Sequence, residues 1–355
     1  MKVKPNIDLL SVSSLGVRLT PFSPEPVHTS HLFSMQATSA ETNVLTINAS
    51  LGLRTRVLTK FVKDSPIASF IQKDLQRRGI EWIGPSIKKG GPWGYRHQIN
   101  IADSGYGFRG PIVTNDRAGE VGRTLSSSDF SLEELFHSET ILALHLSGLI
   151  ASLSKETGNL CNDIVTIAKQ HKTQISFDLN YRASFWHNRK TELSTVFQTI
   201  ASKSDILIGN EEDFQLCLDI KGPEAGGNDI DSQIYSYKEM IKLVQKTYPN
   251  VSLIATTLRQ VIHANEHLWG ALMYKDDSFY LIRPEPIQVK DRIGGGDGFV
   301  GGLLYGLNRG FDNDRLLQFA WASGAYVATL LKDYGEPLNE SQIWNIWNKN
   351  ARVKR

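Results

Sequence analysis

Short apolar runs alternate with amphipathic stretches along most of the chain, and this pattern predicts its elements. The apolar runs are typical of buried strands, and they occupy residues 7–12, 54–61, 141–146, 174–177, 206–208 and 251–256. The amphipathic stretches place their apolar positions on one helical face, and they occupy residues 41–51, 67–78 and 156–170. This alternation predicts an α/β fold with a doubly wound, mainly parallel sheet flanked by helices.

Residues 80–124 interrupt this rhythm with short strand-like runs rich in glycine and aromatic residues. Such a block inside an α/β fold predicts an inserted antiparallel sheet that forms a lid over a pocket. We therefore expect residues 1–355 to form a single domain with a small β-sheet lid, built from about residues 12–37 and 80–124. After residue 297 the pattern becomes helical almost to the end of the chain.

The composition excludes several classes of function. The 39 basic and 37 acidic side chains leave a net charge of +2, which gives no electrostatic reason to expect a nucleic acid or a membrane as partner. No run approaches the ~18 apolar residues of a membrane span, so we expect a cytoplasmic protein. Cys161 and Cys217 lie far apart without cysteine or histidine companions. This argues for core thiols and against a disulfide scaffold or a structural zinc site.

One glycine-rich motif carries candidate chemistry. Gly294, Gly295 and Gly296 follow a β-like run and precede an amphipathic helical stretch. Consecutive glycines let several N–H groups converge, and the helix dipole makes such a turn favourable for a phosphate. Asp297 follows directly, where a carboxylate can take the proton of an attacking hydroxyl. Phosphoryl transfer requires these parts.

Two other interpretations of the motif compete with this one. Gly296, Gly298 and Gly301 formally match the dinucleotide-binding pattern G-x-G-x-x-G. That pattern requires a following strand with an acidic residue about 20 positions on, but here a second helical stretch, residues 316–331, follows. The motif could also be a glycine-rich helix start that only packs closely on the sheet. That interpretation leaves the acid beside the anion-binding turn unexplained.

Six segments resemble the ribokinase (PfkB) family of carbohydrate kinases. The motif Asp291-Arg292-Ile293-Gly294-Gly295-Gly296-Asp297 is similar to the D-R-x-G-G-G-D of the 2-keto-3-deoxygluconate kinase branch. The other five are similar to segments of that branch in the expected order, and they are residues 115–117, 145–148, 177–186, 210–214 and 257–259. The resemblance covers nearly the whole chain and implies a ribokinase-like fold, with ATP and Mg²⁺ as cofactors.

The resemblance also implies roles for individual residues. Asp297 would be the catalytic base, and the N–H groups of Gly294 to Gly296 would hold the charge of the transferring phosphoryl group. Asn210 and Asp213 would organise Mg²⁺ largely through water, and Asp291 lies where the family often binds a monovalent cation such as K⁺. The ATP site would include Asn210, Thr257, Arg259, Gly294, Gly296, Ser323 and Gly324.

A sugar acid carries a carboxylate, which requires cationic recognition. Arg182 is a candidate because it follows a predicted strand, and ligands bind at the carboxyl ends of such strands. Arg117 and Arg109 are further candidates within the lid block, although a surface ion pair is the commonest role of an arginine. Asn43 corresponds to the family's substrate-binding asparagine, or else is an ordinary residue of a first helical turn.

The sequence departs from the family on the sugar side of the expected pocket. The usual early acid is missing beside Val17, Thr38 and Ser39 replace two glycines, and Asn115 replaces a tyrosine. We expect phosphorylation of the terminal hydroxyl of 2-keto-3-deoxygluconate. A kinase for a neutral sugar or another ketose acid, and a non-catalytic sugar or nucleotide sensor, remain alternatives. Exposed edges of the lid strands favour a homodimer.

Overall fold

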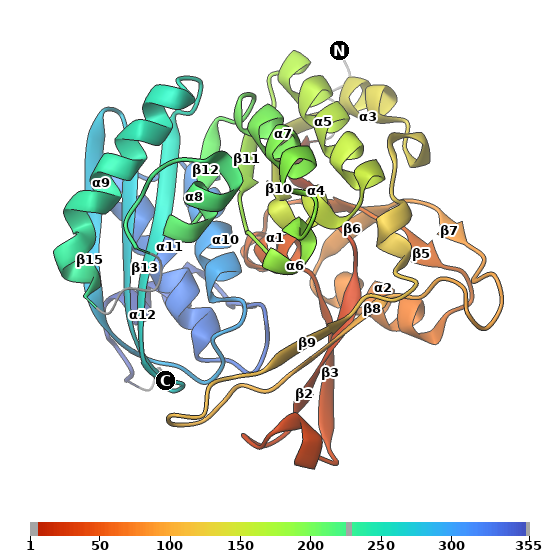
Figure 1. The fold of residues 1–355 in the computed structure, drawn as a ribbon, viewed down its shortest axis with the longest axis horizontal. Coiled ribbons are helices and arrows are strands. Elements are labelled where there is room, and N and C mark those ends of the chain that lie inside the picture. Colours follow the sequence, from red (N-terminus) through yellow and green to blue (C-terminus); the bar gives the residue numbers. More distant parts are fainter. Residues whose placement is uncertain (1–5, 225–228, 353–355) are drawn as a thin grey trace.

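The computed structural model describes residues 6–224 and 229–352 and is built around a nine-stranded sheet (Figure 1). The strand order is β15-β14-β13-β12-β11-β10-β1-β4-β6. Seven neighbouring strands run parallel, and they are β6 (Ile80–Ile83), β4 (Thr55–Leu58), β1 (Asn6–Val12), β10 (Thr140–Ser147), β11 (Gln174–Asp178), β12 (Ile206–Ile208) and β13 (Leu253–His263). The mainly parallel sheet predicted from the apolar runs is confirmed.

Both edges of this sheet differ from the prediction. At one edge, β14 (Glu266–Lys275) and β15 (Ser278–Gln288) continue from β13 as antiparallel strands that the sequence pattern did not reveal. At the other edge, residues 80–83 were expected in the lid but form β6, which pairs with β4. The side chain of Ile80 is buried there against the second helical layer. The second segment of the lid therefore begins later in the chain than residue 80.

Helices cover both faces of the sheet, as a doubly wound fold requires (Figure 1). One layer consists of α3 (Leu132–Ser138), α4 (Gly148–Leu153), α5 (Lys155–Gln170), α7 (Lys190–Ala201), α8 (Glu211–Leu218) and α9 (Ile230–Thr247). Cys161 and Cys217 are buried thiols in this layer. The other consists of α1 (Ala40–Ser50), α2 (Pro66–Arg77), α10 (Gly295–Asn308), α11 (Asn313–Ala328) and α12 (Glu340–Trp347). Throughout the described ranges, no helix is both long enough and apolar enough to cross a membrane.

Helix α10 packs between α1 and α11 at unusually short range. A Cβ atom added at Gly298 would lie 2.9 Å from the carbonyl oxygen of Ser323, and one at Gly302 would lie 2.4 Å from Ser323 Oγ. On the opposite side, a Cβ atom at Gly301 would lie 3.0 Å from the carbonyl oxygen of Val44. Two glycines of the formal dinucleotide pattern thus serve helix packing, because only hydrogen fits at these contacts.

A separate four-stranded sheet forms the lid and projects from the body of the molecule (Figure 1). Its order is β3-β2-β8-β9, and its strands are β2 (Gly16–Pro21), β3 (Phe33–Thr38), β8 (Gln98–Ala102) and β9 (Val113–Asp116). The expected purely antiparallel arrangement is wrong in one respect, because β2 and β8 run parallel. They can do so since the long connection between them contains α1, β4, α2 and β6.

The two faces of the lid sheet differ in polarity. Arg18 of β2 pairs in register with Gln36 of β3 and Asn100 of β8, so these polar side chains share one face. The neighbouring row lies on the opposite face and consists of Leu19, Met35 and Ile101. The polar face turns toward the glycine-rich turn, since Arg18 forms ion pairs with residues on both sides of that turn.

The packing of α10 on α11 makes a prediction about stability. Alanine normally stabilises a helix interior relative to glycine, but Gly302→Ala should lower the free energy of unfolding by about 1–3 kcal/mol, because its methyl group would overlap Ser323. Urea denaturation followed by circular dichroism measures this. Ser323→Gly in the same chain should recover part of the loss. An unchanged or higher stability of the single variant would contradict the close approach.

Candidate active site

The glycine-rich turn has the conformation that an anion hole requires. Gly294 has a φ of +85°, in the left-handed region, and a Cβ atom there would lie 1.9 Å from the carbonyl oxygen of Asp333. Helix α10 begins at Gly295, and its first N–H groups have no partner within the helix. Gly296 is exposed, and no described atom lies within 4 Å of a Cβ atom added there. The open end of α10 is therefore accessible to an anion.

Asp297 lies in the first turn of α10 and contacts α1. Asn43 Nδ2 donates a hydrogen bond of 2.7 Å to Asp297 Oδ2, so the structure brings these two predicted site residues together. Desolvation raises the pKa of Asp297 to about 7, although the bond from Asn43 acts in the opposite direction. A carboxylate with this pKa accepts a proton readily near neutral pH.

Two further acids lie near Asp297. Desolvation, then the charges of Asp213 and Asp297, raise the pKa of Asp178 well above its ordinary value. Asp178 is the last residue of β11, a position where parallel sheets place ligand contacts, and the sequence analysis did not select it. Desolvation also raises the pKa of Asp213 to about 6, against the hydrogen bonds it accepts from backbone N–H groups. These raised values show negative charge that lacks full compensation.

Asn210 and Asp213 form the N-terminal cap of α8. Asp213 Oδ2 accepts the N–H of Asn210 at 2.8 Å, and Asn210 Oδ1 accepts the N–H of Asp213 at 2.8 Å. Asp213 Oδ1 accepts the N–H of Tyr181, also at 2.8 Å. Across residues 6–224 and 229–352, no three acidic, histidine or cysteine side chains converge on a metal site. This donor set fits a hydrated Mg²⁺, which keeps several of its waters, better than direct coordination by protein.

Three arginines concentrate positive charge near the turn. Desolvation, then the neighbouring charge of Arg292, lowers the pKa of Arg259 to about 10, and Arg182 contributes in the same direction. Although neighbouring atoms desolvate the guanidinium, part of the Arg259 side chain reaches the surface, and with a pKa of about 10 it remains protonated at neutral pH. Thr257, two residues before it on β13, is half-buried. The sequence analysis included Arg292 only as part of the motif, although its position beside Asp291 could have identified it.

The arginines proposed for a substrate carboxylate separate into two groups. Arg117 Nη1 bonds to both carboxylate oxygens of Glu120 at 2.8 and 2.9 Å, and its guanidinium lies 5.1 Å from the ring centre of Phe185. Arg182 precedes α6 (Ala183–Trp186), which contains Phe185, so the lid and the end of β11 meet here. Arg109 is held elsewhere in the lid by Asp103 and by the carbonyl of Pro24.

Ser323 and Gly324 lie within the interface of α10 and α11. Ser323 is fully buried, and its side chain faces Gly302. A Cβ atom on Gly324 would lie 2.8 Å from the carbonyl oxygen of Gly295 and 2.8 Å from the ring of Trp269. Both residues therefore support the start of α10 from behind. Neither presents a side chain to a nucleotide.

Asp291 has protein partners on both carboxylate oxygens. Its Oδ1 accepts the N–H of Ile293 at 3.0 Å, and its Oδ2 lies 2.5 Å from the guanidinium of Arg18. Arg18 also forms an ion pair with Asp333. The sequence analysis missed Arg18 and Asp333, since neither belongs to a motif.

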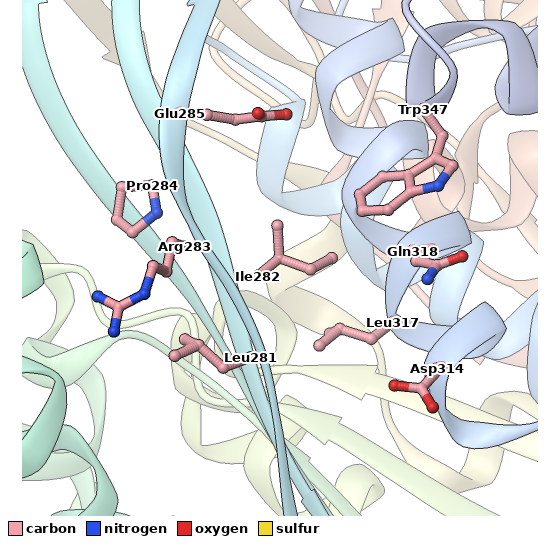
Figure 2. A pocket seen from close by; sticks show the side chains of 9 residues that line it. All are labelled: Leu281, Ile282, Arg283, Pro284, Glu285, Asp314, Leu317, Gln318 and Trp347. Atoms are coloured by element: carbon pink, nitrogen blue, oxygen red, sulfur yellow. The ribbon is translucent and has the colours of Figure 1, made fainter.

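A cavity of about 350 Å³ lies apart from these residues, between β15 and α11 (Figure 2). Trp347 and Gln318 face Ile282 across it, and Arg283 points away (Figure 2). None of the residues predicted for the site lines this cavity.

Comparison with known proteins identifies a family that matches most of the chain. A family described as pfkB family carbohydrate kinase matches residues 6–334. A relative from Clostridium tetani named 5-dehydro-2-deoxygluconokinase is 24% identical, over 91% of this chain and 88% of its own length. The crystal structure of 2-dehydro-3-deoxygluconokinase from Thermotoga maritima aligns with a TM-score of 0.86 and 25% identity, over 98% of this chain and 99% of that one. An E. coli protein assigned provisionally as Ribokinase II, solved with ATP and Mg²⁺, aligns with a TM-score of 0.76 and 18% identity, over 97% and 99%.

The raised pKa of Asp297 makes a prediction about stability. Between about pH 4, the ordinary pKa of an aspartate, and pH 7 the folded carboxyl keeps a proton that the unfolded chain releases, so stability falls as pH rises. Asp297→Asn removes this penalty. The melting temperature of the variant minus that of the wild type should become more positive from pH 4 to pH 8. A difference that does not change with pH would contradict the raised pKa.

Proposed function

Because the chain belongs to the pfkB family of carbohydrate kinases, we propose that it transfers the γ-phosphate of ATP to the terminal hydroxyl of a sugar acid, 2-keto-3-deoxygluconate in the first instance. As a carbohydrate kinase it is a phosphotransferase with an alcohol acceptor. The observation that carries the proposal is the carboxylate of Asp297, which stands at the open N-terminus of α10 and has a pKa of about 7.

The reaction follows from these positions. Asp297 takes the proton of the acceptor hydroxyl while the oxygen of that hydroxyl forms a bond to the γ-phosphorus of ATP. The bond between the γ-phosphorus and the bridging oxygen breaks, and that oxygen leaves with ADP. The hydrogen bond from Asn43 orients the Asp297 carboxylate. The N–H groups at Gly294 to Gly296 stabilise the charge that develops on the transferring group. Arg259 and Arg292 supply positive charge for the nucleotide phosphates.

Mg²⁺ would be held at the acidic side of the site. Kinases of this family use ATP together with Mg²⁺. Asp178 and Asp213 would hold the ion through its waters, with Asn210 keeping Asp213 in place through the α8 cap. When bound, Mg²⁺ neutralises phosphate charge.

Arg182 and Arg117 would bind the carboxylate of the substrate. The Arg117 guanidinium lies 5.1 Å from the ring centre of Phe185, three residues after Arg182, and the exposed Arg182 guanidinium donates a hydrogen bond of 2.8 Å to the Tyr181 carbonyl. The relative and the solved structure described above are both named as kinases of keto-deoxy sugar acids. Thr38 and Ser39, which depart from the family pattern, have structural partners here. Thr38 donates to Asp333, and Ser39 caps α1.

The exposed apolar face of the lid supports a homodimer. Phe33 and Met35 at its edge strand are 38% and 40% exposed. A second copy of the chain, placed face to face on the lid, would remove this apolar surface from water. The enzyme would act in the cytoplasm, where ATP is available.

Replacement of the base makes a prediction about turnover. Asp297→Asn should lower kcat by about 10²–10⁴-fold, while ATP affinity changes little because the glycine turn remains. ADP release, measured across sugar acids, ketoses and nucleosides, tests both the chemistry and the acceptor. Asp314→Asn, at the first turn of the neighbouring helix, is the matched control and should behave as wild type. Near-wild-type turnover by Asp297→Asn would exclude the mechanism.

Charge reversal makes a prediction about the substrate. Arg182→Glu and Arg117→Glu should each raise KM for the sugar acid by about 10–100-fold, the value of a charge-assisted hydrogen bond. KM for ATP should change much less. Arg283→Glu, on the exposed side of β15, is the control. An unchanged KM in both site variants would favour a neutral sugar as acceptor.

A further inference from the structure

A buried ionic triad joins the lid to the phosphate-binding turn. The guanidinium of Arg18 lies between the carboxylates of Asp291 and Asp333, and the three side chains are 1%, 0% and 3% exposed. Arg18 lies in the middle of the lid strand β2. Asp291 and Asp333 lie before α10 and after α11, respectively. One side chain of the lid therefore bonds to the segment before α10 and to the segment after α11.

The two carboxylate residues shape the turn directly. Asp291 accepts the N–H of Ile293 and so fixes the backbone one residue before Gly294. The backbone of Asp333 packs on Gly294 so closely that only glycine fits. Any displacement of Asp291 or Asp333 thus displaces the turn from one side or the other.

We propose that Arg18 is a positioning residue for phosphoryl transfer, whose guanidinium aligns the glycine turn from the lid and supplies the cationic charge at Asp291 from within the chain. The proposal rests on the proposed kinase function. Arginine suits this role because its planar fork reaches two carboxylates at once, whereas the ammonium of lysine is a single point charge. Because the cation is covalently part of the chain, turnover does not depend on a dissolved monovalent cation.

The loop that carries Asp333 has a second anchor that is independent of Arg18. The guanidinium of Arg78 lies 4.2 Å from the ring centre of Tyr334, and Arg77 bonds to Glu336 at 2.6 Å. Thr38 also donates to Asp333, at 2.6 Å. The loop should therefore stay folded when the Arg18 guanidinium is removed, so that an effect on alignment can be distinguished from unfolding.

Arg18→Ala tests the proposal by removing the guanidinium and leaving space for a small cation. With tetramethylammonium as the only added monovalent cation, wild-type kcat should equal that in KCl. The variant should lose about 10²-fold in kcat, as a small misalignment of the reacting groups can cause. Guanidinium chloride at a non-denaturing concentration, or KCl, should restore at least part of this loss. Urea at the same concentration should not. The kcat of Arg18→Lys should lie between those of the wild type and Arg18→Ala.

Controls distinguish alignment from stability and from the identity of the reaction. Arg78→Met removes a buried guanidinium at the C-terminal end of α2 that packs on Tyr334 of the same loop without contact to Asp291, so it should lower the melting temperature but show no cation rescue of kcat. Guanidinium and K⁺ should raise the melting temperature of Arg18→Ala but not of the wild type. The melting temperature can be measured without turnover. It therefore still tests whether the Arg18 site accepts a cation, even if the wild type phosphorylates none of the acceptors and the kinase proposal fails. K⁺-dependent wild-type turnover, or an Arg18→Ala variant with unchanged kcat or without any cation response, would overturn the role of Arg18.

Discussion

The contact of α10 with α1 and α11 is the constraint on which the active site depends. Because Gly301 and Gly302 lack side chains, α10 packs directly on residues of α1 and α11, and this close approach fixes its position relative to both helices. The first turn of α10 carries Asp297, and α1 carries Asn43, which bonds to it at 2.7 Å. Helix packing therefore determines where Asp297, the proposed proton acceptor, stands. A methyl group added at Gly301 or Gly302 would push α10 away from its neighbours. It would thereby move Asp297 and the adjoining glycine turn together, because both lie at the start of α10.

The candidate site contains a group of carboxylates and a group of arginines. A nucleotide and its metal ion would interact with both groups. Asp178, Asp213 and Asp297 have raised pKa values because each is poorly solvated and each lies near at least one other carboxylate. Arg259 and Arg292 have lowered pKa values for the corresponding reasons, desolvation in both and a like charge beside Arg259. Each group is thus in an environment that disfavours its own charge. A metal–polyphosphate complex would stabilise both kinds of charge at once, because the metal ion would face the carboxylates and the phosphates would face the arginines. The charges of the protein itself therefore favour the binding of such a complex.

Six parallel strands of the main sheet could be predicted from the sequence, because they are short apolar runs, and so could the helices α1, α2, α5, α10 and α11. The hairpin of β14 and β15 was missed, since Gly270 interrupts the apolar run of β14 and β15 contains two prolines and no fully buried residue. The hydrogen bond between Asn43 and Asp297 was not predicted, because the two residues are 254 positions apart and the resemblance assigned each of them only a separate role in the site. Arg18 carried no signal at all. An arginine in an alternating strand normally points to water, and only the fold shows that two distant carboxylates face it.

The separation of Arg18 from Asp333 along the chain also bears on synthesis. These residues are 315 positions apart, so the contact can form only after the segment through Asp333 has left the ribosome. A growing or truncated chain can contain the lid, the parallel strands and the carboxylates Asp178 and Asp213. It lacks the segment that packs on Gly294 and closes the phosphate-binding turn. A chain that ends before Asp333 would therefore lack the closed turn on which the proposed phosphoryl transfer depends.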